Sequence, residues 1–229
     1  QTCGPVMAKG IEDTAFYRWF RLVGANEVGG HPETLSIPTT AFHSYAAGRL
    51  ERWPVTMTAL TTHDTKRSED VRARLMVLAS DAAGWEQWVR AASSLGAVHR
   101  SALVDAPTEY LVWQTLVGTW PITAARLEEY VLKAVREAKL HTAWVDGDDA
   151  YEQAVVDFAT GVLRDDAVRA HLDEWVVAQA DSMRANVLGQ KVVQLLMPGV
   201  ADVYQGTELM TLTLVDSVIR RPVLYFVHM

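Results

Sequence analysis

The sequence predicts an α/β protein: the last strands of a partial (β/α)8 TIM barrel, interrupted by a large and mostly α-helical insertion. Two short apolar stretches of strand character, residues 55–61 and 200–204, are separated by roughly 120 residues of helical pattern. The first stretch ends in a polar tip that precedes a helix-start pattern, which is how barrels place functional groups at the C-terminal ends of strands. Since a plain barrel repeat needs only one crossover helix, the helical stretch is interpreted as an insertion between two late strands.

The N-terminal region is predicted to alternate short elements and loops. Residues 1–10 contain glycine and proline between apolar residues and are expected to be a strand or a loop. Glu12 and Asp13, followed by a threonine, offer an N-cap and acids that the helix dipole favours, so a helix is predicted over 12–22. A loop, a helix and a strand are then predicted over residues 24–38, 41–52 and 55–61.

Helical periodicity dominates after residue 68. Apolar residues recur at three- and four-residue steps, as in Leu127, Tyr130, Val131 and Ala134. Helices are predicted over residues 69–78, 85–95, 109–117, 123–139, 151–163, 167–181 and 185–195. The chain is accordingly divided into a barrel segment (1–68), a helical insertion (69–197), and a last strand with the start of a C-terminal region (198–229).

Composition narrows the class of protein. With 229 residues, 49% of them hydrophobic, the chain can bury a core, and its net charge of -7 argues against a nucleic-acid partner but not against a neutral sugar. The single cysteine, Cys3, excludes an internal disulfide and fits a reducing compartment. No apolar run approaches the ~20 residues that span a bilayer. A cytoplasmic protein that does not enter membranes is expected; the oligomeric state is left open.

His63 and Asp64 form the most informative pair. An imidazole beside a carboxylate, with Lys66 and Arg67 close behind, is unusual for an ordinary turn. The spacing alone still favours a solvated turn, because such pairs are common. Lys66 and Arg67 could keep Asp64 ionised, Arg67 through its bidentate fork, or could simply be a solvated charge run before a helix.

Other candidates have structural alternatives. Lys9 is poorly explained by a position before a helix start, where a cation is unfavourable, whereas Glu12 and Asp13 are well explained by it. Tyr17 could stack on a sugar or belong to the core. Glu208 could bind hydroxyl groups or pair with an arginine. Metal and cofactor motifs are missing from the sequence, so no metal and no cofactor are predicted.

Five segments closely resemble signature segments of the maltooligosyl trehalose synthase family, a member of the α-amylase superfamily (glycoside hydrolase family 13). They cover residues 4–18, 62–74, 110–118, 133–139 and 204–209. The resemblance implies an isomerase that acts on maltooligosaccharides. It converts the reducing-end α-1,4 linkage into an α,α-1,1 linkage, in trehalose biosynthesis. It also implies that the nucleophile and the general acid lie upstream of Gln1, so this fragment of the catalytic domain is expected to be inactive alone.

The resemblance assigns roles residue by residue. Asp64 matches the carboxylate that stabilises the transition state, and His63 matches a histidine that binds hydroxyl groups of the reacting sugar. The substrate-binding candidates around them are Lys9, Glu12, Asp13, Tyr17, Lys66, Arg67 and Glu208. The chain departs from the family pattern at Met210-Thr211 and across residues 216–224, where an ion pair of Asp216 with the following arginines is expected instead of sugar contacts.

Two other functions stay open at this point. The chain could belong to a hydrolase of the same superfamily, which transfers the sugar to water. It could also be a non-catalytic helical binding domain or a degenerate remnant. Product analysis with a maltooligosaccharide separates the first from an isomerase, and binding measurements test the second.

Overall fold

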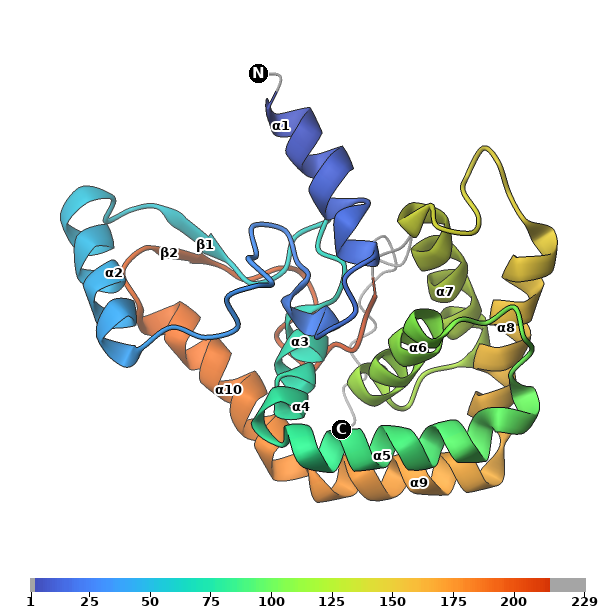
Figure 1. Cartoon of the computed structure of the whole chain (residues 1–229). Coiled ribbons are helices and arrows are strands. Elements are labelled where there is room, and N and C mark those ends of the chain that lie inside the picture. The colour runs from blue at the N-terminus through green and yellow to red at the C-terminus, as the bar shows by residue number, and fades with distance from the viewer. Residues whose placement is uncertain (1–2, 215–229) are drawn as a thin grey trace, which may run out of the picture.

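The computed structural model describes residues 3–214, which are mostly helical (Figure 1). Helices α5 and α9 lie side by side, α6, α7 and α8 gather at one end, and α2 lies with two short strands at the other. From residue 39 onward the α-helices are α2 (Thr39–Arg52), α3 (Glu69–Leu75), α4 (Val77–Ser80), α5 (Ala82–Leu95), α6 (Ala106–Thr119), α7 (Ala124–Ala138), α8 (Asp149–Arg164), α9 (Asp166–Ala178) and α10 (Ala180–Leu196).

The two strands form a small parallel sheet. Strand β1 (Met57–Ala59) pairs with β2 (Val200–Asp202) in the register Met57–Val200, Thr58–Ala201 and Ala59–Asp202. Gln194 of α10 ties them together, because its Nε2 donates to Thr58 O (3.1 Å) and to Asp202 O (2.9 Å). Since parallel strands share a C-terminal edge, the turns that follow β1 and β2 leave the sheet at the same end.

Side-chain caps fix the starts of most of the helices after β1. Ser68, Asp81, Asp105, Thr123, Asp148 and Asp165 each accept a backbone N–H from the first turn of the following helix. Such caps satisfy donors that the helix itself leaves free. These elements confirm the predicted helices within a few residues, except that the one predicted over 69–78 is divided at Met76 into α3 and α4.

The hydrophobic core lies among the helices. Its largest fully buried side chains include Trp113, Tyr130 and Phe158, from α6, α7 and α8. Trp113 packs edge-on against Phe158, with ring centroids 5.7 Å apart, and against Trp88 of α5 at 6.1 Å. Burial of aromatic rings dominates the energetics of such a core, so these side chains are a main source of stability for the helical region.

The N-terminal prediction was wrong in two respects. Residues predicted as strand or loop begin a short helix, α1 (Cys3–Val6), that continues as the π-helix η1 (Met7–Glu12). The helix predicted over 12–22 is instead the single turn Ala15–Tyr17 followed by loop. The buried amide of Asn26 donates to the carbonyls of Phe16 and Trp19, and these two bonds across the loop take the place of helical bonding there.

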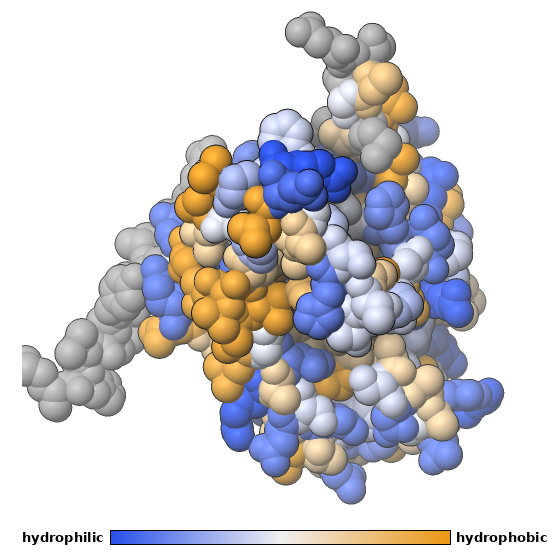
Figure 2. All heavy atoms as spheres, turned by 90° about the vertical axis from the view of Figure 1, so that its left-hand side faces the viewer, coloured by the Kyte–Doolittle hydropathy of each residue, from blue (hydrophilic) through white to orange (hydrophobic). Residues whose placement is uncertain are grey.

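One face of the molecule exposes many apolar side chains. Figure 2 shows this face, on the side of α2 and the strands in Figure 1. Exposed residues from these elements and from α10 include Leu50, Met57, Leu188, Leu196 and Val200. Exposed apolar patches of this kind are typical of interaction surfaces and ligand-binding grooves. Within the described residues, none of the helices has the length and apolar character needed to cross a membrane.

Candidate functional site

The turn after β1 presents His63 and Asp64 to solvent. Thr62 O accepts from the backbone N–H (3.3 Å) and the hydroxyl (2.8 Å) of Thr65, and Asp64 N donates to Thr62 Oγ1 (3.3 Å). These bonds close a tight polar turn. At its tip, His63 Nε2 lies 3.0 Å from Asp64 Oδ2, and the two side chains are 78% and 71% exposed. The carboxylate is thus accessible from solvent in the turn that follows β1.

The entry to this turn is fixed by a buried carboxylate. Thr61 donates its hydroxyl to Glu69 Oε2 (2.9 Å) and accepts the Glu69 backbone N–H at 3.1 Å. Glu69 is 1% exposed and forms an ion pair with Lys191 of α10. The strand end, α3 and α10 are therefore linked directly beneath the turn.

The exit from the turn is buried, and this changes the interpretation of two predicted residues. Lys66 and Arg67 are 4% and 2% exposed. Lys66 Nζ pairs with Asp13 Oδ1 at 3.2 Å, and Arg67 donates to Val23 O (3.0 Å) and to the Tyr130 hydroxyl (2.5 Å). Neither of the two alternatives left open by the sequence, anchoring of Asp64 or a solvated charge run, describes these buried cations. They bind partners in the interior, whereas Asp64 is exposed and pairs with His63.

Asp13 and Tyr17 lie next to Lys66. The ammonium group of Lys66 lies 6.0 Å from the centroid of the Tyr17 ring, and Tyr17 is 4% exposed. Burial, together with the nearby Tyr130, raises the pKa of Tyr17 well above its ordinary value. The buried ring favours the packing role that the sequence also allowed, and its sugar-binding role stays a prediction.

Glu12 lies apart from this cluster. Its Oε1 accepts the Gly29 backbone N–H at 3.4 Å, and it lines a hollow of about 620 Å³ with Phe16, Trp19 and His31. Lys9 belongs to η1, but its side chain is outside the described part of the structure. Residues 216–224, where the chain departs from the family pattern and an ion pair of Asp216 is predicted, also lie outside the described residues.

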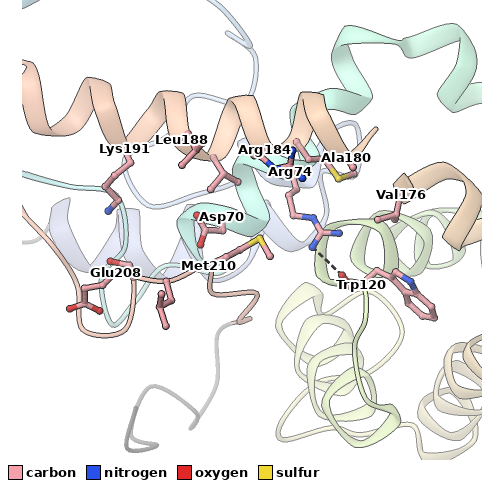
Figure 3. Close-up of a pocket in the computed structure, with 14 residues that line it drawn as sticks. Asp70, Arg74, Trp120, Val176, Ala180, Arg184, Leu188, Lys191, Glu208 and Met210 are labelled. Atoms are coloured by element: carbon pink, nitrogen blue, oxygen red, sulfur yellow. Dashed lines mark hydrogen bonds between the residues drawn. The ribbon is translucent and has the colours of Figure 1, made fainter. Parts of the chain in front are cut away.

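Glu208 follows β2 and lines a pocket of about 460 Å³ (Figure 3). Asp70 and Arg74 of α3 contribute to this pocket, as do Lys191 of α10 and Met210. Burial raises the pKa of Asp70, although the Thr211 backbone N–H donates to its Oδ2 at 2.7 Å. Among the described residues there is no cluster of ligands for a metal ion.

Sequence reasoning missed Glu27. Its buried carboxylate accepts the backbone N–H groups of Lys66 (2.8 Å) and Arg67 (3.1 Å), which follow the His63–Asp64 turn. An acid in a glycine-containing loop is a weak signal in the sequence, and the contact spans about forty positions.

No family model matches this chain. It is 40% identical to a protein of Mycobacterium tuberculosis (strain H37Rv) named "Putative maltooligosyl trehalose synthase", over 98% of this chain and 30% of that protein. The structure of maltooligosyltrehalose synthase from Arthrobacter ramosus superimposes with a TM-score of 0.89 at 45% identity, over 96% of this chain and 28% of that one. A hypothetical maltooligosyl trehalose synthase from Sulfolobus tokodaii gives a TM-score of 0.89 at 31% identity, over 96% and 31%.

These comparisons confirm the resemblance found in the sequence. The chain spans about three tenths of the length of the relatives that it matches. Over nearly all of its own length, this chain is a homologue of that part of the maltooligosyl trehalose synthases.

Proposed function

We propose that this chain forms part of the catalytic site of an intramolecular transglucosylase that acts on maltooligosaccharides. The observation that carries the proposal is the exposed His63–Asp64 pair at the C-terminal end of a parallel strand. The names of the relatives at 40% and 45% identity support this reaction. The product would be a maltooligosaccharide ending in an α,α-1,1-linked trehalose unit.

The chemistry requires three carboxyl groups, of which this chain would supply one. A nucleophilic carboxylate attacks C1 of the penultimate glucose, and an acid donates its proton to the departing O4 of the terminal glucose. The freed glucose then attacks C1 with its anomeric hydroxyl, giving that proton to the conjugate base, and the glycosyl–enzyme bond breaks. Both steps pass through an oxocarbenium-like state, which the negative charge of Asp64 stabilises. By resemblance the other two carboxyl groups precede Gln1, so the chain alone is expected to be inactive.

The partial barrel belongs to the same proposal. The parallel pair β1–β2 would be two neighbouring strands near the end of the barrel sequence, with residues 69–197 inserted between them. The exposed apolar face over α2, the strands and α10 supports this, because the remaining strands of a barrel would cover it (Figure 2). The division at residues 68 and 197, the cytoplasmic location and the sugar-binding roles of the residues around Asp64 stay predictions.

A chimeric enzyme tests the proposal. This chain replaces the homologous 28% of the Arthrobacter ramosus enzyme, whose remaining sequence provides the other parts of the site. We expect the folded chimera to convert maltopentaose into a product with a non-reducing trehalosyl end. Free glucose as the main product would assign the site to a hydrolase, and a folded chimera without either activity would overturn the proposal. The unmodified Arthrobacter enzyme is the positive control.

A further inference from the structure

We propose that Glu27 is a positioning residue for the reaction: its buried carboxylate holds the backbone that follows Asp64 and thereby fixes the catalytic turn. This inference rests on the proposed function of Asp64. Glu27 does not touch the exposed tip of the turn. It acts on Lys66 and Arg67, the two residues that follow Thr65 at the end of the turn, through their backbone N–H groups.

The geometry at Glu27 uses both carboxylate oxygens. Oε1 accepts Lys66 N at 2.8 Å and Val28 N at 2.9 Å, while Oε2 accepts Arg67 N at 3.1 Å. The residue is 4% exposed, so its bonds are shielded from water. Charge-assisted bonds of this kind are stronger than neutral ones, and a carboxylate that receives two consecutive N–H groups fixes the path of the backbone.

Glu27 is itself anchored to the helical core. The preceding residue, Asn26, is fully buried and donates to Phe16 O at 2.9 Å. Gln114 of α6 accepts Val23 N (2.9 Å) and donates to Phe20 O (2.7 Å). The loop that carries Glu27 is therefore attached to a fully buried side chain of α6, and it can act as a fixed support.

The turn is consequently held at both ends. Thr61 and Glu69 hold the entry, and Glu27 holds the exit. Among the described residues, the bonds of the turn itself fix the position of the exposed residues between these anchors, His63 and Asp64. Releasing the exit would let the carboxylate shift relative to a bound sugar. Catalysis is sensitive to shifts of about 1 Å in a positioned group.

Glutamine is the informative replacement. Glu27→Gln has nearly the same shape but replaces one acceptor oxygen with an NH2 group, which faces a backbone N–H and repels it. In the chimeric enzyme we expect kcat to fall about 10- to 100-fold while KM changes less than about twofold. We also expect backbone hydrogen exchange at Lys66 and Arg67 to become about tenfold faster.

The matched control is Glu152→Gln. Glu152 is also buried and also receives three hydrogen bonds, two from Arg136 and one from the Thr142 hydroxyl, but it lies in α8. This variant should lower the melting temperature. At temperatures where it stays folded, it should change neither kcat nor backbone hydrogen exchange at Lys66 and Arg67. If Glu27→Gln does not fold, Glu27→Asp, which keeps the charge on a shorter side chain, is measured in the same way.

Two results would overturn the role of Glu27. The first is unchanged kcat together with unchanged exchange at Lys66 and Arg67. The second is an equal loss of kcat in Glu152→Gln, which would assign both effects to general destabilisation. Failure of the proposed function is distinguishable, because Asp64→Asn would then keep isomerase activity in the same chimera. In that case, the exchange data still show whether Glu27 holds the turn.

Discussion

The buried residues of segment 65–70 are all polar, whereas those of the helices α6–α8 are mainly apolar. Every residue from Thr65 to Asp70 is polar and buried, at 1–7% exposure. In α6–α8, buried positions are mainly apolar, and buried acids such as Glu109 and Glu152 pair with arginines that are partly exposed. Burying six consecutive polar residues costs free energy unless each is satisfied. Such a local departure from the usual pattern is typical of a functional site, whereas α6–α8 follow the rules for stability.

The largest expected effect on stability lies in the helical core. Trp113 is fully buried between Trp88 and Phe158, so Trp113→Ala should remove about 3–5 kcal/mol from the free energy of unfolding. Chemical denaturation measures this change. Trp53→Ala is the control, because Trp53 is 69% exposed and should change the free energy by less than about 0.5 kcal/mol. Equal effects would refute the location of the core.

Glu152→Gln should have an intermediate effect, about 1–3 kcal/mol, since glutamine keeps only one of the two oxygens that accept from Arg136 and Thr142 and loses the charge that faces Arg136. Hydrogen bonding from Arg136 lowers the pKa of Glu152. A lowered pKa stabilises the fold above the unfolded-state value, and the contribution is lost as pH falls through the folded-state value. Unfolding measured from about pH 7 to about pH 3 should therefore show a weaker acid dependence in the variant. An unchanged acid dependence would contradict the pairing.

A helix cap should give the smallest effect. Asp148 accepts Tyr151 N at 3.0 Å at the start of α8, so Asp148→Ala should cost about 1 kcal/mol. The comparison variant is Gln179→Ala, because Gln179 precedes α10 without a capping bond from its side chain. Denaturation midpoints of the two variants should differ; coincident midpoints would argue against the cap.

The contrast between these regions also explains what the sequence could predict. Helices such as α7 were predicted almost to the residue, because apolar periodicity is a local signal. The N-terminal segment was predicted wrongly, since Asn26 bonds across the loop to Phe16. The barrel stays a proposal because only one pair of strands is described.

At the site, the exposed tip was predictable and its support was not. His63 and Asp64 are adjacent in the sequence, at the end of an apolar run, and they belong to a recognisable motif. Glu27 and Lys66 are brought together only by folding, and no local spacing links them. The sequence also did not show that Asp64 and Arg67, three residues apart, differ in burial: Asp64 is exposed, while Arg67 points into the interior toward Tyr130.

The most direct test concerns Asp64 itself. In the chimeric enzyme, Asp64→Asn should lower kcat by about 10²- to 10³-fold, as expected for removal of one group that stabilises the transition state. Its melting temperature should stay within about 1 °C of the parent, because the side chain is 71% exposed. A rate within twofold of the parent would contradict the catalytic role of Asp64. A large fall in melting temperature would show that Asp64 serves the fold instead.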